Sequence, residues 1–140
     1  MYKDIDDKFI MEACKDSGLA DFISEVSLDY VVGQNGAMLS GGQKQKIALA
    51  RALVHNSPVI IFDEATSNTD VYSEHQINGL LHTKLKEKTV IIITHKQEIL
   101  KEADQIIMLK DGAVVGSGVY DDLSKDNLEF KNMLNMGEKY

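Results

Sequence analysis

The feature that most constrains the fold is a pair of short apolar runs with a helical segment between them. Residues 59–62 read Val-Ile-Ile-Phe, residues 89–93 read Thr-Val-Ile-Ile-Ile, and we expect a helix over residues 71–86. Such runs are typical of parallel strands that are buried on both faces of a sheet. The order strand, helix, strand predicts a right-handed parallel crossover, and hence an α/β fold.

Further helices and one hairpin flank this crossover. Helical spacing of apolar residues upstream and an Asp-Gly turn signal downstream define them. No repeat or linker divides the chain, so we expect one continuous domain over residues 1–140. The other expected elements are two short helices within 6–23, a helix over 40–55, a helix over 97–103, strands at 105–109 and 113–115, and helices near 120–124 and 127–136.

Composition narrows the classes of partner and location. The 140 residues carry 22 acidic and 15 basic side chains, a formal net charge of -7, which argues against nucleic acid as a partner. No apolar run approaches the roughly 18 residues of a membrane span, so we expect a soluble chain. The polar, acidic start at residues 1–7 argues against a secretory signal. The single cysteine, Cys14, excludes an internal disulfide and is expected to be a small packed residue on an early helix.

Polar residues follow both predicted strands. Asp63 and Glu64 come directly after the first strand, and His95 follows the second after Thr94. Ligands of open α/β sheets bind at the carboxyl ends of the strands, so these side chains are candidates for one site. Adjacent carboxylates suit Mg²⁺ or a water to be deprotonated, and His95 suits a phosphate or its attacking water. The alternatives are an ordinary polar strand end and a structural histidine.

Leu39-Ser40-Gly41-Gly42-Gln43 is the most informative segment of the sequence. Ser40 and Gln43 have the spacing of a capping box. Gly41 and Gly42 leave the first N–H groups of the helix unobstructed, which favours an anion at the positive end of the helix dipole. A plain capped helix explains Ser40 and Gln43 but not the glycines, because each costs about 1 kcal/mol relative to alanine inside a helix.

Together these segments resemble the ATPase domain of ATP-binding cassette (ABC) transporters. Residues 39–43, 51–53, 59–67, 70 and 93–95 are similar, in order and spacing, to its signature motif, Walker B strand, D-loop and switch histidine. The resemblance covers nearly the whole chain. It implies a partial P-loop NTPase fold, with part of the helical subdomain and the signature in residues 1–56. Residues 57–140 would hold Walker B, the D-loop, the switch histidine and the C-terminal part.

The resemblance also implies a role for each matching residue. Those of the signature would bind the γ-phosphate of an ATP held by the opposite subunit of a head-to-tail pair. Those at the strand ends would act on Mg²⁺ and on the attacking water. In order, the implied roles are γ-phosphate contact for Ser40, Gly41 and Gly42, nucleotide or facing-loop contact for Gln43, Mg²⁺ through water for Asp63, general base for Glu64, dimer contact for Asp70 and γ-phosphate contact for His95.

The loop before the signature points to an exporter. Residues 32–36, with Gly33, Gln34 and Gly36, resemble the loop with which exporters touch their membrane domains, although Gln34 stands where exporters commonly have glutamate. The implied partners are a second ATPase domain and transmembrane domains. The implied location of the parent protein is the cytoplasmic face of a membrane, and its implied activity is ATP hydrolysis that energises transport.

The phosphate-binding pattern Gly-x-x-x-x-Gly-Lys-Ser/Thr does not occur in these 140 residues. The resemblance therefore implies the C-terminal part of the ATPase domain, without Walker A. Phosphoryl transfer depends on positioning the phosphates, so we expect the isolated chain to be inactive. Its strands would also have an unpaired edge, which favours self-association of the chain.

Two other functions fit parts of the pattern. One is the C-terminal ATPase lobe of a DNA-maintenance ATPase, of the chromosome-condensation or break-repair type. The absence of sustained heptads, the acidic charge and the exporter-like loop argue against it. The other is a non-catalytic interaction module, against which Glu64 and His95 argue. The transported substrate is not encoded in these residues.

Overall fold

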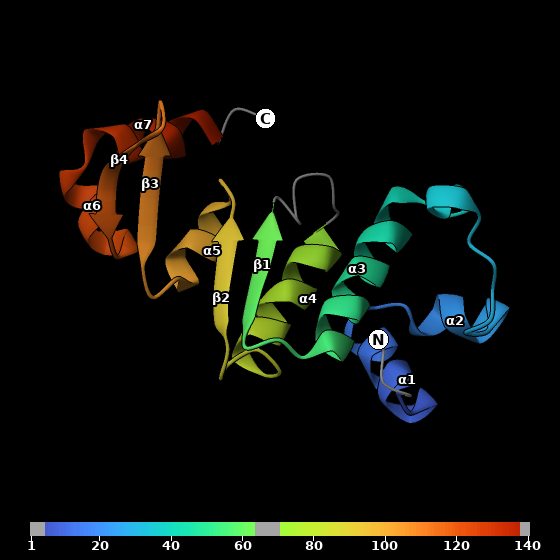
Figure 1. Cartoon of the computed structure of the whole chain (residues 1–140). Helices are drawn as coiled ribbons and strands as arrows, with labels where there is room; N and C mark the ends of the chain where they lie inside the picture. The colour runs from blue at the N-terminus through green and yellow to red at the C-terminus, as the bar shows by residue number, and fades with distance from the viewer. Residues whose placement is uncertain (1–4, 64–70, 138–140) are drawn as a thin grey trace. The chain divides into compact units, whose positions relative to one another are not determined.

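The computed structural model describes residues 5–63 and 71–137 of the chain, with the side chains of residues 71–76 and 136–137 left out. Contacts divide the chain into two compact units, residues 1–92 and 93–140, each described by itself below. The first unit contains α1 (Asp7–Asp16), α2 (Ala20–Val26), a 3₁₀ turn η1 (Gln34–Gly36), α3 (Gly41–His55), β1 (Val59–Asp63), α4 (Val71–His82) and β2 (Thr89–Ile93), whose last residue begins the second unit (Figure 1).

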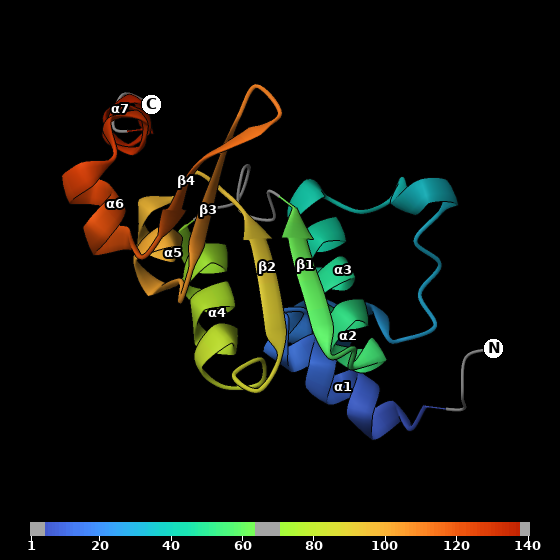
Figure 2. The same cartoon turned by 60° about the vertical axis from the view of Figure 1, so that its left-hand side comes forward.

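The early helices follow the sequence pattern. Asp6 caps α1 by accepting a hydrogen bond from the Lys8 N–H at 3.0 Å, and Gly18, at φ +73°, turns the chain into α2. A core forms between α1 and α3, as their side-by-side position in Figures 1 and 2 also shows. Cys14 lies in this core, and burial raises the pKa of its thiol. The prediction of a packed, unreactive cysteine is confirmed.

β1 and β2 are neighbours in a two-stranded sheet and run in the same direction (Figures 1 and 2). Ile60 and Phe62 of β1 are buried, together with Leu49 and Leu53 of α3, Leu80 and Leu81 of α4, and Leu85. The opposite face is exposed, with Val59 at 47%, Ile61 at 63% and Ile91 at 47%. The prediction that both faces are buried is therefore wrong, because the core of this sheet draws on α3 and α4 and uses one face of the strands only. Within the described residues each strand also has one unpaired edge.

α4 is shorter than the helix predicted over residues 71–86. It ends at His82, and the chain then turns so that the Leu85 N–H donates to the Leu80 carbonyl at 2.9 Å. This turn buries Leu85, which is 1% exposed. Beside it, Lys84 forms ion pairs with Glu12 and Asp16 of α1, and its hydrogen bond to Glu12 holds the pKa of that carboxyl below its usual value. The core and these ion pairs both favour ending the helix early.

The second unit is built on a hairpin with two helices beside it. Its elements are α5 (Gln97–Glu102), β3 (Ile106–Lys110), β4 (Ala113–Gly118), α6 (Tyr120–Asp126) and α7 (Leu128–Gly137) (Figure 2). The predicted turn is confirmed, since Asp111 and Gly112 both have positive φ, +51° and +77°. Leu100, Ile106, Leu123 and Phe130 form the core. None of the described helices is long and apolar enough to cross a bilayer.

A side-chain bridge that the sequence pattern did not predict holds α7 to the hairpin. The pairing of β3 and β4 shifts after Met108, and the Asn127 amide donates to the Val115 carbonyl at 3.1 Å. The Asn127 carbonyl oxygen accepts from the Phe130 N–H at 2.9 Å, so one side chain serves both elements. A Cβ at Gly116 would lie 2.7 Å from the Asn127 nitrogen, which explains the glycine.

We predict that Phe130→Ala lowers the free energy of unfolding of the second unit by about 3–5 kcal/mol, because Phe130 is fully buried. The matched control is Leu128→Ala on the same helix, where the side chain is 72% exposed and the change should stay within about 0.5 kcal/mol. Urea unfolding followed by hydrogen exchange at α6 and α7 measures both. Equal losses in the two variants would contradict the assigned core.

Candidate functional site

The first turn of α3 has the cap that the sequence predicts. The Gln43 N–H donates to Ser40 Oγ at 3.2 Å, and the Ser40 N–H donates to Gln43 Oε1 at 2.8 Å. This confirms the capping box. The first N–H groups of an α-helix have no partner inside the helix, and the box serves those of Ser40 and Gln43. The amides of Gly41 and Gly42 therefore remain for a ligand.

The two glycines of this turn are not required by the packing of the chain. A Cβ added at Gly41 or at Gly42 would meet no atom within 4 Å, and both residues are exposed. Neither has a positive φ. What two Cβ atoms would fill here is open space beside the free amides. The arrangement is suited to an anion that approaches the backbone closely at the positive end of the helix.

The glycines of the preceding loop differ, because their own chain requires them. Gly33 and Gly36 have φ of +76° and +66°. A Cβ at Gly33 would lie 3.2 Å from Met38 Cγ, and one at Gly36 would lie 3.3 Å from Leu39 Cδ1. The loop thus has a structural reason for both glycines, and the predicted contact of Gly33, Gln34 and Gly36 with a membrane domain stays a prediction.

The same loop presents apolar side chains to solvent, which the motif comparison did not single out. Val31 is 76% exposed and Met38 is 60% exposed. The loop is anchored at its start by an edge-to-face contact between Phe22 and Tyr30, with ring centroids 5.8 Å apart. A hydropathy scan of the loop alone gives the signal for these residues, since apolar side chains flank its glycines.

The fold brings the first turn of α3 and the end of β1 to the same end of the first unit. α3 and β1 run in opposite directions and are joined by residues 56–58 only, so the start of the helix and the end of the strand point the same way (Figures 1 and 2). Asp63 ends β1 and is exposed. Glu64 and Asp70 lie outside the described residues. Asp63 is thus the predicted strand-end residue that the structure places near the signature end of this unit.

His95 belongs to the second unit. It is exposed and follows β2 in a turn in which the Lys96 N–H donates to Thr94 Oγ1 at 3.0 Å. Asp63 lies in the first unit, so the approach of His95 to Asp63 and to Glu64 stays a prediction.

The donor set at Asp63 fits a weakly held Mg²⁺ rather than a protein-enclosed one. Within residues 5–63 and 71–137, no three His, Cys, Asp or Glu side chains converge as a metal site. Mg²⁺ keeps several waters and commonly binds through one or two carboxylates together with substrate phosphates. One exposed carboxylate at the carboxyl end of a parallel strand fits that mode. When bound, Mg²⁺ would neutralise phosphate charge at this end of the unit.

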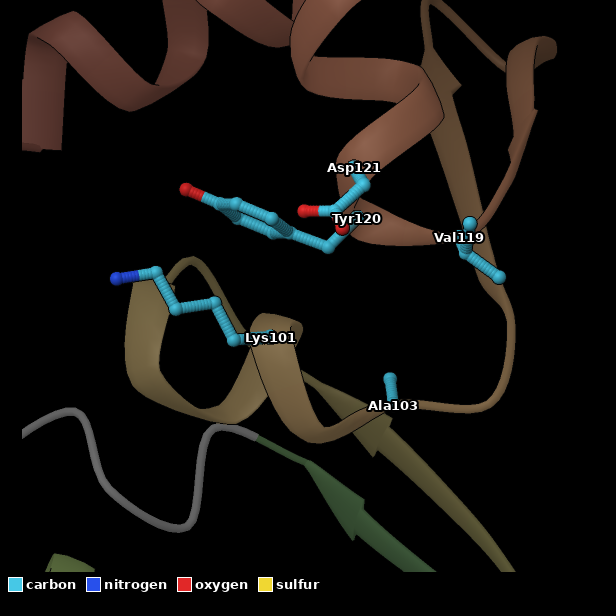
Figure 3. Close-up of a pocket in the computed structure, with 5 residues that line it drawn as sticks. All are labelled: Lys101, Ala103, Val119, Tyr120 and Asp121. Carbon is cyan, nitrogen blue, oxygen red and sulfur yellow. The ribbon is translucent and has the colours of Figure 1, made fainter.

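A separate pocket of about 210 Å³ lies in the second unit between α5 and the start of α6 (Figure 3). The Lys101 ammonium lies 5.8 Å from the centroid of the Tyr120 ring. The ring also packs edge-on against Phe130 at 5.7 Å. Lys101, Ala103, Val119, Tyr120 and Asp121 line the pocket. It contains none of the residues predicted for nucleotide, so it is distinct from the predicted site.

Comparison with known proteins gives the same family for the first half of the chain and for its relatives. Residues 5–67 match the sequence profile described as ABC transporter. The alpha-hemolysin translocation ATP-binding protein HlyB of Proteus vulgaris is 46% identical over 119 residues, 84% of this chain and 17% of the relative. The ATP-dependent lipid A-core flippase of Pseudomonas fluorescens (strain Pf0-1) is 40% identical over 130 residues, 91% of this chain and 22% of the relative.

A solved structure agrees with these relatives. A bacterial Atm1-family ABC exporter with ATP bound superposes with a TM-score of 0.88 and 31% identity, over 96% of this chain and 24% of that chain. The chain thus spans about a fifth of the length of the relatives it matches.

We predict that glycines of the two kinds respond oppositely to alanine. Gly41→Ala and Gly42→Ala should each raise the free energy of unfolding by about 0.4–1 kcal/mol, because the helix gains propensity and nothing clashes. Gly36→Ala should lower it by about 1–2 kcal/mol, because alanine is strained at positive φ. Urea titration of the three variants measures this. Destabilisation by Gly41→Ala would mean that packing inside the chain explains that glycine after all.

Proposed function

The chain contains part of an exporter-like ABC transporter ATPase domain, and we propose that this part supplies the signature side and the strand-end side of two ATP sites. Ser40, Gly41 and Gly42 would receive the γ-phosphate of an ATP held by a second ATPase domain in a head-to-tail pair, with Gln43 beside the nucleotide. Asp63, Glu64 and His95 would act on the ATP held by a phosphate-binding lobe with a Walker A loop.

The observation that carries this proposal is the open first turn of α3. Two consecutive glycines, each costly in a helix, leave room that no atom of the described chain fills. An anion that contacts backbone amides at the helix start gives a reason for both. The same end of the unit holds the Asp63 carboxylate, which is suited to the magnesium ion that accompanies nucleotide phosphates.

The chemistry follows from charge. In phosphoryl transfer the protein contributes mainly positioning and electrostatic stabilisation. Amides at the start of α3 would stabilise negative charge on the γ-phosphate, and Glu64 would orient and deprotonate the attacking water. His95 would donate a hydrogen bond to the γ-phosphate. Asp70 would cross the dimer interface.

We propose further that the whole protein is an exporter at the cytoplasmic face of a membrane. The names of the relatives support transport as the use of ATP hydrolysis. The loop with Gly33, Gln34 and Gly36, flanked by exposed Val31 and Met38, would contact its transmembrane domains. The exposed sheet face and unpaired strand edges support a proposal that the isolated 140-residue chain self-associates.

The isolated chain tests the need for a phosphate-binding lobe. At saturating Mg-ATP the purified 140-residue chain should show no turnover above a protein-free control, because it has no loop to hold the β- and γ-phosphates. A coupled phosphate-release assay measures this. A rate comparable to that of a complete cassette would disprove the assignment of roles.

A pair of glycine variants tests the signature turn in a polypeptide that joins this chain to a Walker A lobe. Gly42→Asp should lower kcat by about 10²-fold or more, because a carboxylate there repels the γ-phosphate and covers the free amides. Gly79→Asp on α4 is the matched control, since Gly79 is also an exposed helical glycine with open space around it. Equal turnover in the two variants would show that the turn of α3 does not bind the reacting phosphate.

A further inference from the structure

We propose that Lys88 is a positioning residue that fixes the direction of α3, and with it the place of Ser40–Gln43, relative to β1. The effect of Lys88 on turnover rests on the function proposed above. Its effect on the direction of α3 does not, because all the contacts that carry it lie inside the first unit.

The Lys88 ammonium joins the end of α3 to the start of β1. Its Nζ donates to Asn56 Oδ1 at 2.7 Å and to the Ser57 carbonyl at 2.8 Å. Asn56 is the C-cap of α3 and is left-handed, at φ 52° and ψ 36°. Hydrogen bonds from a charged donor are roughly twice as strong as neutral ones, and a cation at a helix C-terminus is favoured by the helix dipole. One side chain therefore binds both residues at which the helix becomes the strand.

Lys88 is itself held in place by the backbone. Its N–H donates to the Leu85 carbonyl at 2.9 Å, and Leu85 is buried in the sheet core. The next residue, Thr89, donates its N–H to the Pro58 carbonyl at 3.0 Å, which joins the start of β2 to the start of β1. The ammonium is thus attached to the sheet, and it transmits the position of the sheet to the end of α3.

The start of α3 depends on this attachment because packing holds only the later part of the helix. Its residues in the two core clusters are Ile47, Leu49, Ala50, Leu53 and Val54. Residues 40–46 include none that is buried. At 1.5 Å per residue, Ser40 lies about 24 Å along the axis from Asn56, so a tilt of about 5° at the C-cap moves the signature turn by about 2 Å. Displacements of about 1 Å in a catalytic site can cost about 10²-fold in rate.

The direct test measures the direction of α3 in the 140-residue chain. Spin labels at Lys44→Cys on α3 and Ile61→Cys on β1, in a Cys14→Ala background, give a distance distribution by pulsed electron resonance. Lys88→Met removes both hydrogen bonds but keeps most of the stem, and should broaden the distribution by about 2 Å, as the lever predicts. Lys88→Arg should restore the wild-type width, because a guanidinium can donate to both oxygens.

The control is Lys86→Met, which removes the same charge from an exposed position two residues earlier and should leave the width unchanged. A wild-type width in Lys88→Met would overturn the proposal. So would equal broadening in Lys86→Met, or an unrestored width in Lys88→Arg when circular dichroism shows that the variant is folded.

Turnover in a polypeptide that carries the Walker A lobe gives the second measurement. Lys88→Met should lower kcat about 10-fold or more while the KM for ATP changes less than about 2-fold, since the signature turn acts on the γ-phosphate rather than on the rest of the nucleotide. Lys88→Arg should restore kcat, whereas a kcat that Lys88→Met leaves unchanged would overturn the catalytic part. If Gly42→Asp also leaves turnover unchanged, the proposed function itself fails, and the distance measurement still decides the role of Lys88.

Discussion

The burial of Ile60 and Phe62 beneath α3 and α4 is the interaction on which the first unit depends. Apolar side chains of a strand alternate between two faces, so these two and their neighbours on β2 define one face that helices must cover. Leu49 and Leu53 cover it from α3, and Leu80 covers it from α4. Because the connection of residues 56–58 is short, this packing also sets where α3 begins. The signature turn and Asp63 reach the same end of the unit as a consequence.

The glycines of the chain show how packing separates structural from functional positions. Gly33 and Gly36 adopt positive φ and lie against Met38 and Leu39, so the conformation of the loop explains them. Gly41 and Gly42 have ordinary helical backbone with empty space around them, so an external group explains them better than the fold does. The motif gave all four the same weight.

Sequence periodicity predicted most elements because their causes are local. The capping box of Ser40 and Gln43, the Asp111-Gly112 turn and the apolar strands depend on neighbours within a few residues. The early end of α4 was missed because its causes are distant in sequence: Leu85 is buried in the sheet core and Lys84 pairs with α1. Asn127 was missed for the same reason, since its partner Val115 lies on the hairpin.

The sequence by itself determined the order of the motifs, the helix caps and turns and the chemistry of Ser40–Gln43, Asp63, Glu64 and His95, because these follow from residue types at fixed spacings. The tertiary structure decided which strand face is covered, which glycines the fold requires and how Lys88 joins the end of α3 to the sheet. These depend on which side chains meet from distant parts of the chain. A wholly apolar strand can be covered on one face or on two, and only the packing of the helices distinguishes the two cases.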